Sequence, residues 1–136
     1  ELAHQVRTLT DLTDYERGIT ISVGLIQGGS AVNTVPAAAE MQVDARVWRL
    51  EDAAWVNQQV YALRPHLPGA SLQISGGVER PPMERLPGTV RLFELARRLG
   101  QEIGLELVER AVGGASDGNF TAALGIPTLD GLGVCG

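Results

Sequence analysis

Apolar residues along the first half of the chain recur with two different periods, which separate helices from strands. The first four apolar positions have the spacing of one helix face, and they are Leu2, Val6, Leu9 and Leu12. Gly18 is expected to end this helix. Apolar residues then occupy every second position of 19–25 and of 39–47. That alternation is typical of half-buried strands, and the turn-forming residues between the two runs predict an antiparallel pair.

The spacing returns to a helical period in the segment that follows. Glu51 and Asp52 are suited to the first turn of a second helix, because acidic side chains interact favourably with the helix dipole there. The expected buried stripe of this helix consists of Val56, Val60, Leu63 and Leu67. Leu72 and Ile74 are expected to start a third strand. The order helix, strand, strand, helix, strand predicts an α+β sandwich with both helices on one face of an antiparallel sheet.

A stiff, proline-rich segment at 80–84 cannot continue a sheet, so it predicts a crossover to a second unit. A helix from Pro87 is expected next, with one apolar face formed by Val90, Phe93, Ala96, Leu99 and Ile103. Residues 105–112 predict a short strand, 120–124 a short helix and 128–130 the end of a last strand. This is the order of a parallel α/β domain, but a piece of about 50 residues is too small to stand alone.

Charge and composition narrow the classes of function. The net charge is −5, and all 11 basic residues are arginines, which argues against a nucleic-acid surface and a polybasic membrane patch. No apolar run has the length of a transmembrane helix. The single cysteine, Cys135, excludes an internal disulfide framework and fits a reducing compartment such as the cytoplasm. Because the chain starts without Met, within a helical pattern, we expect it to be part of a longer protein.

The loop at 113–119 is the most informative stretch for chemistry. It fits a glycine-rich turn before a helix, with Ser116 or Asp117 as the N-cap. It also contains Gly-x-Ser-x-Gly, the form of a serine-hydrolase elbow. Such an elbow needs a histidine downstream, whereas His4 and His66, the two histidines of the chain, both precede it. Serine hydrolysis is therefore poorly supported, because a nucleophile without a positioned base is inert.

Two residues outside this loop are candidates for binding a substrate. Asn33 lies in the loop before Pro36, where it is either a turn residue or an exposed amide for a substrate oxygen. Arg110 lies near the end of the strand predicted at 105–112, where it either forms an ion pair with Glu109 or binds a carboxylate through its forked N–H groups. The chain has no His-Glu-x-x-His, no paired histidines and no cysteine cluster, so no metal ligand is predicted in it.

Four stretches, taken in order, resemble the M20 family of metallopeptidases, near its glutamate carboxypeptidase and acetylornithine deacetylase branches. The stretches are Gly28-Gly29-Ser30-Ala31-Val32-Asn33-Thr34-Val35-Pro36, Asp44-Ala45-Arg46, Pro81-Pro82-Met83-Glu84, and residues 113–119 together with 125–133. Each is weak alone, but their order and spacing match across nearly the whole chain. The resemblance implies that residues 1–80 form a ferredoxin-like lid, or dimerisation domain, that lacks its first strand. It implies that 84–136 form a truncated α/β part of a zinc-hydrolase catalytic domain.

The resemblance also implies roles for the candidate residues. Asn33 would contact the substrate, and Arg110 would hold its carboxylate. The loop lining the active site would be formed by Gly113, Gly114, Ala115 and Ser116. No catalytic residue of the family falls within this chain. The lid would form a homodimer, and the remainder of the catalytic domain would be a further partner.

In the parent protein the resemblance implies two zinc ions, held by a His-x-Asp, a Glu-Glu pair and a late His that this chain lacks. No metal is therefore expected in this chain, which should be inactive alone. The parent would hydrolyse amide bonds in small acyl-amino acids or peptides with a free carboxylate. The alternative is a non-enzymatic oligomerisation or small-molecule-binding module with a ferredoxin-like fold. That alternative explains 1–80 equally well, but it does not explain the 113–119 loop or Arg110.

Overall fold

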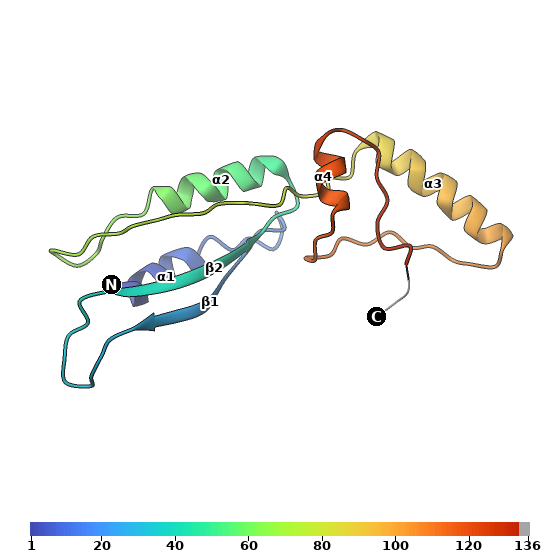
Figure 1. The fold of residues 1–136 in the computed structure, drawn as a ribbon. Helices are drawn as coiled ribbons and strands as arrows, with labels where there is room; N and C mark the ends of the chain where they lie inside the picture. The colour runs from blue at the N-terminus through green and yellow to red at the C-terminus, as the bar shows by residue number, and fades with distance from the viewer. Residues whose placement is uncertain (134–136) are drawn as a thin grey trace. The chain divides into compact units, whose positions relative to one another are not determined.

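A computed structural model describes residues 1–133, so Cys135 lies outside the described part. The chain forms two compact units, Glu1–Glu79 and Arg80–Gly136. The first contains helix α1 (Leu2–Thr10), strands β1 (Thr20–Gly28) and β2 (Ala39–Arg46), and helix α2 (Leu50–Tyr61); the second contains helices α3 (Pro87–Glu102) and α4 (Gly118–Ala123) (Figure 1). This composition confirms the α+β class. Within residues 1–133, no helix combines the length and apolar character needed to cross a membrane.

The core of the first unit joins both of its helices to one face of the sheet. Leu9 of α1 and Val56 of α2 are buried together with Ile19 and Ile21. The partly buried side chains packed around them are Leu12, Met41, Ala45, Val47, Trp55, Val60 and Leu63. Ile21 pairs with Ala45 across the antiparallel ladder, so their side chains share the face that the helices cover. Both helices thus cover one face of the sheet, as expected.

A bulge at Gly24 changes which residues of β1 face the core. The register passes from Val23 opposite Val43 to Leu25 opposite Gln42, so one extra residue is accommodated in β1. Because side chains alternate across a strand, the extra residue moves Leu25 to the outer face and places Ile26 on the core side, opposite Met41. The strict alternation predicted through Leu25 is therefore wrong beyond Val23.

The structure also corrects three predicted strands. Leu72 and Ile74, residues 105–112 and residues 128–130 are not part of any strand in the described chain. A strand requires a neighbour for its backbone hydrogen bonds, and β1 and β2 pair with each other. Leu72 and Ile74 still alternate in burial with their exposed neighbours. The sequence pattern therefore predicted which side chains face inward, but not that the backbone would be paired.

Helix α1 ends at Thr10, well before the predicted stop at Gly18. Gly18 belongs instead to a tight turn, in which the backbone groups of Asp14 and Ile19 exchange hydrogen bonds of 2.9 and 2.8 Å. Its φ of +73° is a conformation that glycine adopts without strain. Gly18 thus has the left-handed backbone of a helix-ending glycine, but it serves a turn that leads into β1.

Arg17, which lies in this turn, contacts two residues of α2. Its guanidinium pairs with the carboxylate of Asp52, which is only 2% exposed, and lies 4.6 Å from the centroid of the Trp55 ring. The Arg17 side chain itself is 43% exposed. Loss of Arg17 would therefore leave a buried carboxylate without its cationic partner, which costs more than loss of an exposed ion pair.

We predict that Arg17→Met lowers the free energy of unfolding of the first unit by about 2 kcal/mol. Arg49 is the matched control, because its ion pair with Glu51 is exposed on both sides. Arg49→Met should change the free energy of unfolding by less than about 0.5 kcal/mol. Urea unfolding followed by circular dichroism measures both variants. Equal losses of unfolding free energy in the two variants would mean that the burial of Asp52 does not increase the contribution of its ion pair with Arg17 to stability.

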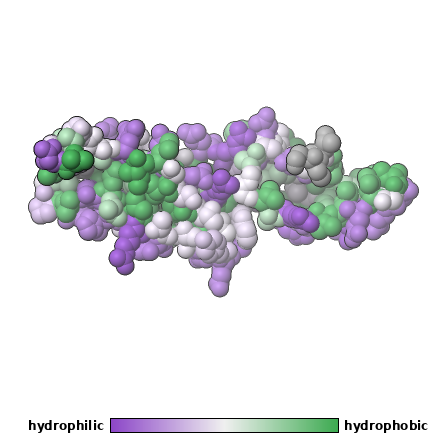
Figure 2. Space-filling model, turned by 90° about the horizontal axis from the view of Figure 1, so that it is seen from below, coloured by the Kyte–Doolittle hydropathy of each residue, from purple (hydrophilic) through white to green (hydrophobic). Residues whose placement is uncertain are grey.

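Both units leave much apolar surface exposed (Figure 2). In the first unit Leu25 and Ile26 of β1 are 61% and 57% exposed. The second unit has almost no core, since the residues buried within 80–133 are Gly100, Asn119 and Ala122. Leu95 and Leu99 of α3 are exposed, and so is Ile103 directly after the helix. The second unit therefore has too little buried surface to be stable by itself.

Candidate functional site

The candidate substrate loop, residues 113–119, is held by bonds between side chains and backbone. The backbone N–H of Ser116 donates to Oδ1 of Asn119 at 2.9 Å, and the N–H of Gly118 donates to Oγ of Ser116 at 3.1 Å. Asp117 occupies the N-cap position of α4, but its side chain makes no capping bond. The loop is thus a compact turn into a helix, in which Ser116 Oγ accepts a backbone hydrogen bond.

Two residues at the start of the second unit attach to this turn. Nδ2 of Asn119 donates to the carbonyl oxygen of Pro81 at 2.8 Å. The guanidinium of Arg80 lies 3.3 Å from Oδ1 of Asp117 and 4.9 Å from the centroid of the Phe120 ring. Asn119 and Arg80 lie in two stretches that the sequence singles out, but the contacts between these stretches were not predicted. Their partners lie nearly forty residues away, so no local pattern could reveal the attachment.

Arg110 is exposed, and the first of its two interpretations, an ion pair with Glu109, is wrong. Glu109 pairs with Arg85 instead, with distances of 2.5 Å from Nε to Oε1 and 3.1 Å from Nη2 to Oε2. The hydrogen bond from Arg85 holds the pKa of Glu109 below its usual value. Arg110 has no acidic partner among residues 1–133, so its forked N–H groups are available to a carboxylate from solution.

The candidate residues are divided between the two units. Arg110 lies in the second unit, three residues before Gly113, and both are exposed. Gly114 and Ala115 are exposed, and Ser116 is half-buried. Asn33 lies in the first unit, in the fully exposed loop that joins β1 to β2. Arg110 and residues 113–116 are thus close in sequence within the second unit, whereas Asn33 belongs to the first unit.

The described residues do not fit a zinc site. Within residues 1–133, no three His, Cys, Asp or Glu side chains are grouped so that they could hold a metal ion. His4 and His66, both exposed, stack against each other with ring centroids 5.1 Å apart. Metal ions of the kind that the resemblance implies would need ligands from outside this part of the chain.

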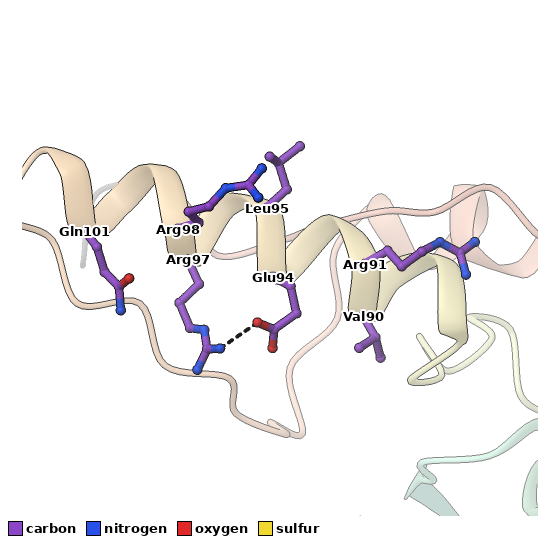
Figure 3. Close-up of a pocket in the computed structure, with 7 residues that line it drawn as sticks. All are labelled: Val90, Arg91, Glu94, Leu95, Arg97, Arg98 and Gln101. Atoms are coloured by element: carbon purple, nitrogen blue, oxygen red, sulfur yellow. Dashed lines mark hydrogen bonds and ion pairs between the residues drawn. The ribbon is translucent and has the colours of Figure 1, made fainter.

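An open depression along α3 is not a convincing binding site (Figure 3). Its lining residues all come from this one helix, and they are Val90, Arg91, Glu94, Leu95, Arg97, Arg98 and Gln101. Arg97 and Glu94 form an ion pair of 2.6 Å along the helix. A ligand site needs walls from several elements to remove a molecule from water, so this depression is the exposed surface of a helix.

Comparison with known proteins assigns the chain to a family. The model of the peptidase dimerisation domain of M20 enzymes matches residues 1–69, which include α1, β1, β2 and α2. Carboxypeptidase G2 of Pseudomonas sp. (strain RS-16) is 28% identical over 134 residues, a match that covers 96% of this chain and 32% of the relative. The chain thus spans about a third of that relative's length. It belongs to the M20 peptidase family, and its residues 1–69 match the peptidase dimerisation domain.

Proposed function

We propose that residues 1–80 are the lid and 84–136 part of the catalytic domain of a metal-dependent amide hydrolase. Its substrates would be small acyl-amino acids or peptides with a free carboxylate. One observation carries the proposal: similarity to a carboxypeptidase continues over 134 residues, well past the 1–69 region of the dimerisation domain. A dimerisation module alone gives no reason for the similarity to include Arg110 and the 113–119 loop.

The proposed substrate contacts follow from the chemistry of the exposed groups. The guanidinium of Arg110 would bind the substrate carboxylate through two parallel N–H bonds. Backbone N–H groups of Gly113, Gly114 and Ala115 and the turn at Ser116 would line the site. The Asn33 amide, carried by the exposed β1–β2 loop, would donate to a substrate oxygen. Ser116 would position the loop rather than attack the substrate, since its Oγ accepts the Gly118 N–H.

The metal ions of the parent, two zinc ions by resemblance, would be held by residues outside this chain. When bound, they would supply an activated water for amide hydrolysis. This chain alone would therefore be inactive. The remainder of the catalytic domain would cover the exposed apolar residues Leu95 and Leu99 of α3 and Ile103 directly after it.

A second copy of the chain would bind to the first unit and form a homodimer. The family match to a dimerisation domain supports this partner. Within the described residues the sheet has two strands, so each strand has an edge without a partner strand. Figure 2 shows apolar residues gathered on one face of this unit. Unpaired edges beside apolar surface favour association with another chain.

The test compares this chain with the longer protein that contains it, by metal analysis and by hydrolysis of an N-acyl glutamate. We expect the longer protein to bind about two metal ions per chain and to cleave the substrate, and a chelator to abolish cleavage. The isolated chain should do neither. Turnover by the isolated chain would contradict the proposal. A longer protein that neither binds metal nor cleaves would favour the non-enzymatic module.

A further inference from the structure

We infer that Asn119 is a positioning residue, which fastens the substrate loop to the segment that connects the two units. The inference rests on the proposed function, because it assumes that residues 113–116 line the substrate site. Asn119 is only 9% exposed, and both ends of its side-chain amide are used. Its Oδ1 accepts from the Ser116 N–H at 2.9 Å, and its Nδ2 donates to the Pro81 carbonyl at 2.8 Å.

The segment to which Asn119 attaches is rigid. Pro81 and Pro82 have fixed φ angles and no backbone N–H, so this segment offers carbonyl oxygens but no donors. The Asn119 amide supplies a donor to one of these carbonyl oxygens, that of Pro81. The hydrogen bond joins a stiff segment to a short loop, and it fixes the loop more firmly than a bond to a flexible segment would.

Arg80 makes a second attachment between the same two segments. Its guanidinium contacts the carboxylate of Asp117 and the ring of Phe120, on either side of Asn119. The preceding residue, Glu79, is the last of the first unit. Arg80 and Pro81 are therefore the covalent connection from the lid to the second unit. Figure 1 shows this segment passing beside α4.

A displacement of this connection would be transmitted to the loop through Asn119. If Pro81 moves, the Asn119 amide must follow or lose its hydrogen bond, and the Ser116 N–H moves with it. The conformation of the substrate loop would thereby depend on the position of the segment at Arg80 and Pro81. The Asn119 amide can make both bonds at once, because its oxygen accepts and its NH₂ group donates.

The variant Asn119→Asp, made in the longer protein, keeps one of the two hydrogen bonds of the Asn119 side chain and removes the other. Aspartate keeps the acceptor for the Ser116 N–H, but it loses the donor and sets a carboxylate against the Pro81 carbonyl. We expect KM for an N-acyl glutamate to rise roughly tenfold or more, because small misplacements of binding groups are costly. Hydrogen exchange of the 113–118 amides should also become faster. Asn57→Asp, at a half-buried position on α2, is the matched control and should leave KM unchanged.

Arg80→Ala tests the same attachment at a half-exposed position, where a folding defect is not expected. We expect a smaller rise in KM and faster exchange of the same amides. If Asn119→Asp does not fold, Arg80→Ala decides the question. An unchanged KM in the folded variants, with only a lower Tm, would reduce Asn119 to a structural role and overturn the inference.

Arg110→Gln distinguishes failure of this inference from failure of the proposed function. If Arg110→Gln raises KM while Asn119→Asp and Arg80→Ala do not, this inference is wrong and the proposed site stands. If Arg110→Gln also leaves KM unchanged, the proposed site is wrong and the inference falls with it.

Discussion

Gly18→Ala is expected to lower the free energy of unfolding of the first unit by about 3 kcal/mol or more. Two costs combine at this position. The φ of +73° disfavours any residue with a Cβ, and a Cβ built here would lie 2.0 Å from Cδ2 of the Trp48 ring. The clash involves the base of the indole, so the ring must move as a whole. Urea unfolding followed by circular dichroism and tryptophan fluorescence gives the change.

Gly69→Ala separates these two costs. Gly69 has a similar φ of +82°, but nothing lies within 4 Å of the position that its Cβ would occupy. This control should lose about 1–2 kcal/mol, the cost of the backbone conformation alone. Equal losses in the two variants would show that Trp48 moves aside freely, and that its packing against the turn contributes little to stability.

Arg110→Gln in the longer protein is expected to reduce kcat/KM for an N-acyl glutamate by about 100-fold. The loss corresponds to about 3 kcal/mol, the contribution of charge-assisted hydrogen bonds to a carboxylate. Arg110→Lys should recover only part of it, because an ammonium group cannot bind both carboxylate oxygens through a planar fork. Steady-state kinetics on metal-loaded protein measures both variants.

Two controls make the Arg110 result specific. Arg97→Gln removes an exposed arginine from α3 and should leave kcat/KM unchanged. A substrate with an amide in place of the carboxylate should be poor for the unmodified protein, and Arg110→Gln should discriminate little between the two substrates. If the variant still prefers the carboxylate strongly, another residue binds that group.

Local periodicity predicted which segments form the helices and the pair of strands, but not where each element ends. The antiparallel pair β1–β2 and the acidic start of α2 at Glu51 and Asp52 are confirmed. The third strand at Leu72 and Ile74 is wrong, because pairing depends on a neighbouring backbone that no local pattern contains. The bulge at Gly24 was missed for a related reason. An extra residue is recognisable only against the strand that it faces.

The same limit applies to the candidate site. The loop at 113–119 is visible in the sequence because its glycines are consecutive, and Arg110 is visible because it precedes them. Their roles came from the resemblance and remain predictions. The pairing of Glu109 with Arg85 reverses the expected ion pair, since charge alone does not say which of two arginines lies nearer in space.

The bulge in β1 also bears on how a deletion could redirect the loop that carries Asn33 in this chain. Bulges bend the strand that contains them, so Gly24 helps to set the direction in which the loop with Asn33 leaves the sheet. Beyond the bulge Leu25 pairs with Gln42 and Ile26 pairs with Met41. Neither pair involves Gly24. Loss of that one glycine would redirect the loop while the core kept all of its apolar partners. A single-codon deletion could thus alter what Asn33 reaches without a compensating change elsewhere.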